Sequence, residues 1–309
     1  MTAVQMTVAG LFVFLILASL IVAILSRTRP GKSSRELVLR IRSWWVIIVL
    51  FSIALLGGRR LGIGFLAFVS FLALKEFFSM IPTRRADRRV LLWAYLSIPI
   101  QSFFIYIEWY GMFITVVPIY MFLGLPMKMI QVGETRQFLK SLSTVHWGMM
   151  TCVFSLGHVA FLLVMPSEKG LDVSGPGLVL FLVALTQLND VAQFCWGKMI
   201  GGARITPEVS PNKTWAGFIG GVVTTTLLSV LIAPFLTAFT FPHSLYAGLL
   251  ISICGFIGDV TMSAVKRDLG VKDFGNILPG HGGILDRIDS LCYTAPVFFH
   301  FTRYLSGTQ

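Results

Sequence analysis

Long apolar stretches make up most of this chain, and short polar segments separate them. A helix needs about 20 apolar residues to cross the hydrocarbon core of a bilayer, and fewer where flanking side chains snorkel. Ten stretches meet or approach this length, although the two between residues 44 and 81 also fit one span plus a re-entrant piece. They are residues 7–25, 44–58, 61–81, 90–107, 110–127, 147–165, 177–199, 215–238, 245–263 and 291–305. The pattern predicts an all-α, polytopic membrane protein with nine or ten transmembrane helices.

Composition agrees with this interpretation. Of the 309 residues, 55% are hydrophobic and 13% are charged, and the mean hydropathy is +0.80. A soluble domain usually carries about 25% charged residues. The composition therefore excludes a soluble globular enzyme, a disordered chain and a disulfide scaffold. The four cysteines lie far apart beside apolar residues and form no CxxC pair, so we expect small apolar packing residues rather than disulfides or a zinc site.

The first apolar stretch is interpreted as a retained helix rather than a signal peptide. It has no basic segment before it and no small-residue cleavage pattern, and Arg27, Arg29 and Lys32 follow it.

The basic residues predict the topology. If the N-terminus lies outside and all ten stretches cross, the inner loops are residues 26–43, 82–89, 128–146, 198–214 and 264–290, and they hold 20 of the 25 Lys and Arg residues. Cytoplasmic loops collect such residues. The net charge of +11 is explained in this way, so we do not expect nucleic acid as a partner. We expect an integral protein of a bacterial inner membrane whose polar loops face the cytoplasm.

The two parts of the chain differ in character. Residues 1–180 are predicted to be transmembrane helices joined by basic loops, and residues 181–309 a catalytic membrane region with cytoplasmic loops 198–214 and 264–290. Seven of the 14 acidic residues lie at position 190 or beyond: Asp190, Glu208, Asp259, Asp268, Asp273, Asp286 and Asp289.

Asp190 lies inside an apolar stretch. Ionisable residues within a membrane usually face a water-filled cavity or a partner. A structural hydrogen bond within the bundle is the alternative, but the neighbouring Asn189 and Gln193 favour a polar pocket.

The polar segment before residue 215 has the composition of an anion site. Ser210, Lys213 and Thr214 directly precede an apolar stretch. Hydroxyl groups, a lysine and the free N–H groups of a helix start can bind phosphate. An ordinary basic loop that ends in a capping threonine is the alternative.

The segment from 258 to 290 carries the most chemistry. If the span at 245–263 continues as a helix, Asp259, Ser263 and Lys266 share one face. Asp286 and Asp289 are spaced i,i+3 and project together on a helix. Mg²⁺ is usually bound by one or two carboxylates plus substrate phosphates. The Pro279–Gly283 turn lacks bulky side chains apart from His281, so its backbone N–H groups can approach a phosphate.

A transporter with intramembrane carboxylates is the rival interpretation. It would explain Asp190 and Asp259, but not the cations, glycines and Asp-x-x-Asp spacing in one loop. Transporter sites also tend to lie between repeated halves, and no internal repeat is visible.

Residues 263–289 resemble the signature of the phosphatidate cytidylyltransferases, also called CDP-diacylglycerol synthases. That pattern is S-x-hydrophobic-K-R-x4-K-D-x-small-x2-hydrophobic-P-x-H-G-G-hydrophobic-x-D-R-hydrophobic-D, and the chain satisfies every fixed position. The resemblance covers about residues 185–295, including Asn189-Asp190 and the segment 210–214. Met262 stands where many members have an acidic residue, and Gln193 where many have an aromatic one. These departures suggest a paralogue of the main synthase that uses phosphatidate or another lipid phosphate.

The resemblance implies the reaction of CTP with phosphatidate to give CDP-diacylglycerol and pyrophosphate for phospholipid synthesis. It implies one or two Mg²⁺ ions, for which Mn²⁺ substitutes, and a homodimer among membrane lipids. The expected metal ligands are Asp259, Asp286 and Asp289. The residues expected to take part in catalysis are Asp190, Lys266, Arg267, His281, Asp286 and Asp289. The residues expected to bind substrate are Ser210, Lys213, Thr214, Ser263, Lys272 and Arg287.

Overall fold

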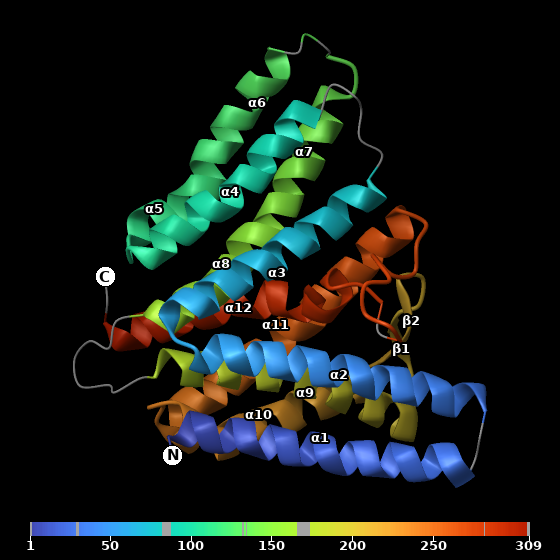
Figure 1. Ribbon diagram of the computed structural model, residues 1–309. Coiled ribbons are helices and arrows are strands. Elements are labelled where there is room, and N and C mark those ends of the chain that lie inside the picture. Colours follow the sequence, from blue (N-terminus) through green and yellow to red (C-terminus); the bar gives the residue numbers. More distant parts are fainter. Residues whose placement is uncertain are drawn as a thin grey trace.

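The computed structural model describes residues 2–28, 31–81, 88–131, 133, 135–165, 174–280 and 282–307, and most of these residues are helical (Figure 1). The helices before residue 165 run in the order α1 Ala3–Thr28, α2 Lys32–Leu56, α3 Arg59–Met80, α4 Arg88–Tyr106, α5 Tyr110–Thr115, η2 Val116–Met121, α6 Phe122–Ile130, α7 Phe138–Met149, η3 Met150–Ser155 and α8 Leu156–Val164. The π-helical turns η2 and η3 follow directly on α5 and α7, so the ten segments form six rods in the described part of the chain.

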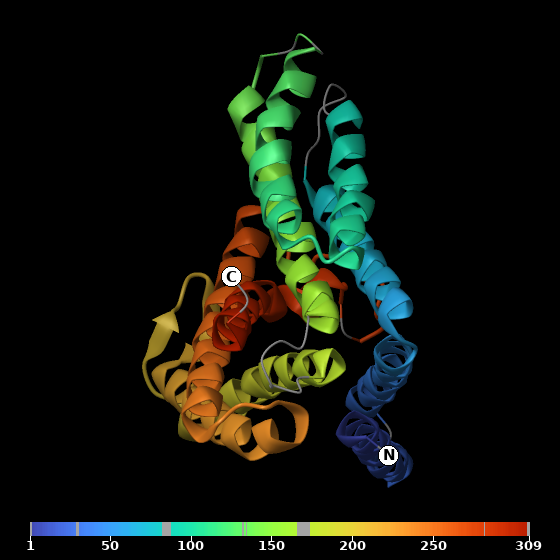
Figure 2. The same ribbon diagram turned by 90° about the vertical axis from the view of Figure 1, so that its left-hand side faces the viewer.

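The later elements are α9 Gly175–Ile200, β1 Arg204–Thr206, β2 Ser210–Thr214, α10 Trp215–Leu236, α11 Phe241–Asp268 and α12 Leu285–Ser306. The two strands pair antiparallel as a small hairpin, in which Thr206 lies opposite Ser210. Helix α10 packs between α9 and α11. Figure 2 shows α4 to α8 gathered at one end of the molecule and α9 and α10 at the other. Helix α12 lies between the two groups and contacts α3 and α8 as well as α9 and α11.

The prediction of a polytopic helical membrane protein is confirmed. Among the described residues, eight helical segments are long and apolar enough to cross a membrane, and Val90–Tyr106 is a shorter apolar helix. Helix α12 has 22 residues but is less apolar, because its first turns carry charged side chains. Together these segments agree with about ten helices. The region between residues 44 and 81 forms two separate helices, α2 and α3, rather than one span with a re-entrant piece.

Several predicted loops are shorter than expected. Helix α2 begins at Lys32, so much of the expected loop 26–43 is helical. Helix α11 continues to Asp268 and α12 begins at Leu285, which reduces the expected loop 264–290 to residues 269–284. The expected loop 198–214 contains the end of α9 and the hairpin. A helix can continue from an apolar stretch into the flanking polar residues, because helical backbone hydrogen bonds do not require apolar side chains. The predicted division at residue 180 falls within α9 and stays a prediction.

Close contact between α9 and α10 depends on glycine. A Cβ atom on Gly217 would lie 2.7 Å from the carbonyl oxygen of Gln193, and one on Gly221 would lie 2.3 Å from Cγ of Gln193. The absence of side chains at both positions lets the helices approach closely, as in other membrane helix pairs. This contact places Gln193 of α9 beside the start of α10, where the candidate site begins.

Candidate active site

Three carboxylates from three helices lie close together at the centre of the C-terminal elements. Asp190 belongs to α9, Asp259 to α11 and Asp289 to α12. Asp190 and Asp259 are near enough for their charges to act on Asp289, and Asp259 also acts on Asp190. Asp289 is buried, with 9% of its surface exposed. Crowded carboxylates in a low-dielectric site repel one another unless cations compensate them.

Ser290 connects two of these helices. Its hydroxyl donates to both carboxylate oxygens of Asp190, at 3.2 and 3.0 Å. Its backbone N–H donates to Oδ1 of Asp289 at 2.8 Å. One residue of α12 therefore fixes a carboxylate of α9 and the carboxylate that precedes it in its own helix.

Lys213 supplies positive charge from the hairpin. Its ammonium group forms an ion pair with Asp259 and donates to Oε1 of Gln193 at 3.0 Å. It also interacts electrostatically with Asp190. The β2 strand thus carries this lysine to the carboxylate cluster. The predicted anion site at 210–214 stays a prediction.

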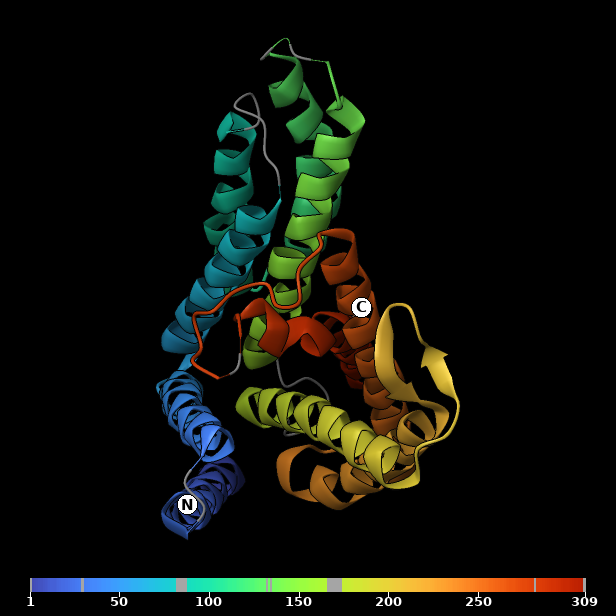
Figure 3. The same ribbon diagram turned by 90° about the vertical axis from the view of Figure 1, so that its right-hand side faces the viewer.

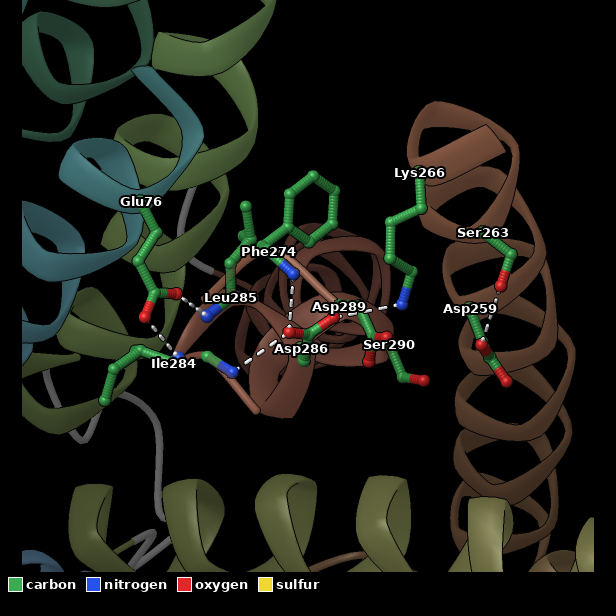
Figure 4. A network of polar contacts seen from close by, with 11 residues as sticks. Glu76, Asp259, Ser263, Lys266, Phe274, Ile284, Leu285, Asp286, Asp289 and Ser290 are labelled. Atoms are coloured by element: carbon green, nitrogen blue, oxygen red, sulfur yellow. Dashed lines mark hydrogen bonds and ion pairs between the residues drawn. The ribbon is translucent and has the colours of Figure 1, made fainter. Parts of the chain in front are cut away.

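Lys266 and Asp286 form a second ion pair, 3.0 Å between Nζ and Oδ1, in which the Asp286 side chain is almost fully buried (Figure 4). The other oxygen of Asp286 accepts from the backbone N–H groups of Phe274 and Gly283, at 2.8 and 3.0 Å. Asp286 therefore connects Phe274 and Gly283 to the start of α12. Asp286 and Asp289 are both buried, as a shared helix face predicts, but they bind different partners.

The predicted face of α11 is confirmed. The helix continues past Asp259, and Ser263 donates to Oδ1 of Asp259 in a long hydrogen bond of 3.5 Å. Lys266, two turns beyond Asp259, reaches Asp286 of α12. Figure 4 shows Asp259, Ser263 and Lys266 along the side of α11 that faces α12.

The remaining predicted substrate residues differ in their surroundings. Arg267 and Lys272 are exposed, and Nε of Arg267 donates to the carbonyl oxygen of Val209 in the hairpin at 3.3 Å. Nε of Arg287 is buried and has no hydrogen-bond partner, and this side chain interacts electrostatically with Asp190. An unpaired buried donor beside a carboxylate cluster is suited to an incoming anion.

Two predicted residues lie at the edge of the hairpin, and a third lies outside the described residues. Thr214 caps α10, because its hydroxyl accepts from the N–H of Gly217 at 3.1 Å, as the alternative interpretation of this segment predicted. Ser210 begins β2 and is half-buried. His281 lies outside the described residues, so its predicted role stays a prediction.

Glu76 is a site residue that the sequence did not indicate. It is 4% exposed and comes from α3, more than 200 positions before α12. Its two carboxylate oxygens accept from the N–H groups of Ile284 and Leu285, at 2.9 and 2.8 Å. The only available signal was a charged residue inside the apolar stretch 61–81, which by itself does not indicate a partner.

The carboxylate cluster fits a hard divalent cation that substrate phosphates help to bind. Among the described residues, no group of three or more His, Cys, Asp or Glu side chains is arranged to hold a metal ion. Mg²⁺ does not require such a cage, since it usually takes one or two carboxylates plus phosphate and water. Asp259 and Asp289 offer such oxygens beside Asp190. Both oxygens of Asp259 have partners, Ser263 and Lys213, as both oxygens of Asp286 do. The prediction that Asp259, Asp286 and Asp289 bind metal stays a prediction.

A bundle of membrane helices with carboxylates and lysines in one buried site fits the class of membrane-embedded enzymes that act on phosphate groups. Within this class, the chain belongs to the Cytidylyltransferase family, whose sequence profile it matches over residues 38–305. It is therefore a nucleotidyltransferase and an integral membrane protein.

Individual relatives divide into two kinds. The chain is 45% identical over 300 residues to a protein of Escherichia coli (strain K12) described as "Uncharacterized protein YnbB", covering 97% of this chain and 98% of that protein. It is 39% identical over 133 residues to the phosphatidate cytidylyltransferase of Brucella suis, covering 43% of this chain and 49% of the relative. For the phosphatidate cytidylyltransferase of Bacillus subtilis the values are 37% over 140 residues, with 45% and 52% covered. The chain thus aligns with only about half the length of these two synthases.

Proposed function

We propose that this protein transfers the cytidylyl group of CTP to a lipid phosphate, with phosphatidate as the first candidate, and releases pyrophosphate. The product is then CDP-diacylglycerol, a precursor for phospholipid synthesis. The observation that carries the proposal is the meeting of Asp190, Asp259 and Asp289 with Lys213 and Lys266 between helices of a membrane protein. Membership of the Cytidylyltransferase family supports transfer of a cytidylyl group. The relatives named as phosphatidate cytidylyltransferases support phosphatidate as the acceptor.

The chemistry requires positioning and charge compensation rather than a general base. An oxygen of the lipid phosphate attacks the α-phosphorus of CTP, and the bond from that phosphorus to the β-phosphate oxygen breaks. The attacking group is already an anion, so no proton has to be removed. The main obstacle is the repulsion between two anions, which fixed cations reduce in a site with little water.

Residues of this chain can supply that compensation from two sides. Lys213 reaches the cluster from the hairpin, and Lys266 reaches it from α11. Nε of Arg287 and Nε2 of Gln193 are buried donors without hydrogen-bond partners, and both are near these lysines or their carboxylates. We assign all four to the phosphate groups of the substrates. Arg267 and Lys272 are exposed and would act at the entrance.

Asp259 and Asp289 are the residues that would hold Mg²⁺, with Asp190 beside them. When bound, Mg²⁺ would neutralise phosphate charge between the two substrates. Lys213 now compensates Asp259, and this contact would be exchanged for phosphate when CTP binds.

The proposed orientation places the site at the cytoplasmic surface of a bacterial inner membrane, where CTP is available. Impermeant thiol labelling of intact cells tests it. A cysteine introduced at Asn276 should be protected, and one introduced at Lys169 should react. Reaction at residue 276 from outside would contradict the orientation. A homodimer is part of the proposal, and the mass of the purified protein in detergent tests it.

The decisive experiment is an assay of purified protein with labelled CTP, Mg²⁺ and phosphatidate in mixed micelles. A labelled CDP-lipid should form, with one pyrophosphate released for each product. Parallel reactions with lysophosphatidate and with phosphatidylglycerol phosphate examine other lipid phosphates. An Asp289→Asn protein, prepared identically, controls for contaminating host synthase. If the wild-type protein forms no CDP-lipid from any of the three, the proposal fails.

A further inference from the structure

Helix α12 begins after an N-cap residue, Ile284, that has no capping side chain. The first N–H groups of a helix have no partner within the helix and need acceptors from elsewhere. A Ser, Thr, Asp or Asn immediately before the helix normally provides one. Here the chain has Gly282, Gly283 and Ile284 before α12, and none of these has a side chain that can accept a hydrogen bond.

Two carboxylates take the place of the missing cap, and they bind three successive N–H groups. Asp286, in the first turn of α12, accepts from the N–H of Gly283, three residues before it, at 3.0 Å. Glu76 accepts from Ile284 and Leu285 with one oxygen each. The negative charge also lies at the positive end of the α12 dipole. Glu76 therefore acts as an N-cap that a distant helix supplies.

The neighbouring glycines make room for this carboxylate. A Cβ atom on Gly283 would lie 2.5 Å from Oε2 of Glu76, and one on Gly275 would lie 2.6 Å from Oε1. Both distances are far below van der Waals contact, so any side chain at either position would displace Glu76. These two glycines of the segment 269–284 therefore leave a space that fits the carboxylate of Glu76.

Glu76 binds the start of α12, which carries residues of the candidate active site. Figure 3 shows the segment between α11 and α12 running from α11 towards α2 and α3 and then back to α12. The segment is also attached to α2, where the hydroxyl of Ser43 donates to the carbonyl oxygen of Pro279 at 2.8 Å. Glu76 binds at the end of this return, within one turn of Asp286 and Arg287 and less than two turns from Asp289 (Figure 4).

We propose that Glu76 is a positioning residue for catalysis, which fixes the start of α12 and thereby the orientation of Asp289 and Arg287 towards the substrate phosphates. Glu76 itself contacts only backbone N–H groups of this start in the described network, and not the carboxylate cluster. Its effect on the reaction is then transmitted through α12. In this way α3, one of the N-terminal helices, stabilises the active site through Glu76.

The test uses the full-length protein with Glu76→Gln, which keeps the shape of the side chain. The amide offers only one acceptor oxygen, and its NH₂ group faces a backbone N–H. Hydrogen exchange, measured by mass spectrometry, should rise about 10- to 100-fold in a peptide covering residues 282–290, the cost of losing a charge-assisted hydrogen bond. Peptides from α10 should exchange as in the wild type. This measurement does not depend on which reaction the protein catalyses.

The kinetic part rests on the proposed function. In Glu76→Gln, kcat should fall by about 10- to 100-fold while KM for CTP changes much less, because positioning acts mainly in the transition state. The matched control is Glu108→Gln, the same change at an exposed glutamate that pairs with Arg59 at the far end of α3. Its exchange and kinetics should stay at the wild-type level.

The outcomes distinguish the role of Glu76 from the proposed transfer of a cytidylyl group to a lipid phosphate. Unchanged exchange in residues 282–290 would overturn the cap. Faster exchange throughout the molecule would make Glu76 an ordinary structural residue and overturn the positioning role. Local exchange that rises without loss of kcat would also overturn it. If wild-type protein has no activity with any lipid phosphate while the local exchange still rises, the proposed function fails and the cap stands.

Discussion

Helix α1 and the elements after residue 174 differ in which side chains they bury. In α1 only Val4, Val8 and Leu15 are buried, and large apolar side chains such as Phe14 remain exposed. This surface suits contact with lipid. The elements from α9 to α12 bury acids, amides and hydroxyls, including Asn189, whose side chain donates to the carbonyl oxygen of Ser252 at 3.2 Å.

The difference shows where the physical constraints on the sequence lie. A lipid-facing side chain needs only to be apolar, so many sequences satisfy α1. A buried carboxylate or amide needs particular partners, because an unpaired polar group in a low-dielectric interior is costly. Substitutions should therefore have strong effects around α12 and weak effects on α1. Glu76 of α3 and Ser43 of α2 are constrained in the same way, since they bind the start of α12 and the segment before it.

Removal of divalent metal should have the largest effect. With EDTA, turnover should fall by more than about 100-fold, because several kcal/mol of charge compensation in the transition state is lost. Mg²⁺ or Mn²⁺ should restore it, while the fold, followed by circular dichroism, should not change. Full activity in EDTA would show that Lys213 and Lys266 suffice, and the carboxylate cluster would need another explanation.

Asp289→Asn should lower kcat by at least about 100-fold and leave membrane insertion intact, because it removes charge from the metal-binding cluster and little volume. Asp259→Asn should behave similarly. Asp268→Asn is the matched control, since Asp268 ends the same helix as Asp259 but is exposed. Steady-state rates of CDP-lipid formation check the series. Equal rates for the Asp289 and Asp268 variants would remove the distinction between the buried cluster and the surface.

Lys266→Ala and Arg267→Ala should differ, although the residues are adjacent. They point about 100° apart on α11. Lys266 therefore pairs with Asp286, whereas Arg267 donates to the carbonyl oxygen of Val209 in the hairpin. We expect each to raise a different Michaelis constant, one mainly for CTP and one mainly for lipid. Losing a charged contact to phosphate costs about 1.5–3 kcal/mol, or roughly 10- to 150-fold. Separate titrations of CTP and lipid check this. Identical changes in both constants for both variants would show that the two side chains act as one unit.

Two threonines at helix starts provide the smallest and most local test. Thr214→Ala should destabilise the protein by about 1 kcal/mol, because it removes a capping hydroxyl that accepts from Gly217. Thr240→Ala should change stability by less than about 0.5 kcal/mol, since Thr240 precedes α11 without a side-chain cap. Unfolding in mixed SDS micelles measures both. If Thr214 binds phosphate as well, its variant should also raise KM for CTP, and an unchanged KM would limit it to capping.

The positions of the helices and the residues of the site could be predicted from the sequence to a large extent. Apolar stretches of about 20 residues have few alternatives in a bilayer, so their number and order follow from the pattern. The i, i+4 and i+7 spacing placed Asp259, Ser263 and Lys266 on one face of α11, because the helix repeat makes such residues neighbours. The ends of helices were less predictable: polar first turns extended α2 and α12 beyond their apolar parts.

What only the tertiary structure decided is which of these charged groups meet. Local spacing brought Asp286 and Asp289 together, but packing assigned one to Lys266 and two backbone N–H groups, and the other to the cluster with Asp190 and Asp259. Glu76 looked like an isolated acid in an apolar stretch until α3 was packed beside the start of α12. Periodicity reports which face of a helix is buried, whereas a contact between residues 76 and 284 depends on how all the intervening helices pack. For this protein, the sequence determined the chemical groups of the site, and the packing of α3, α9, α11 and α12 determined how they are paired.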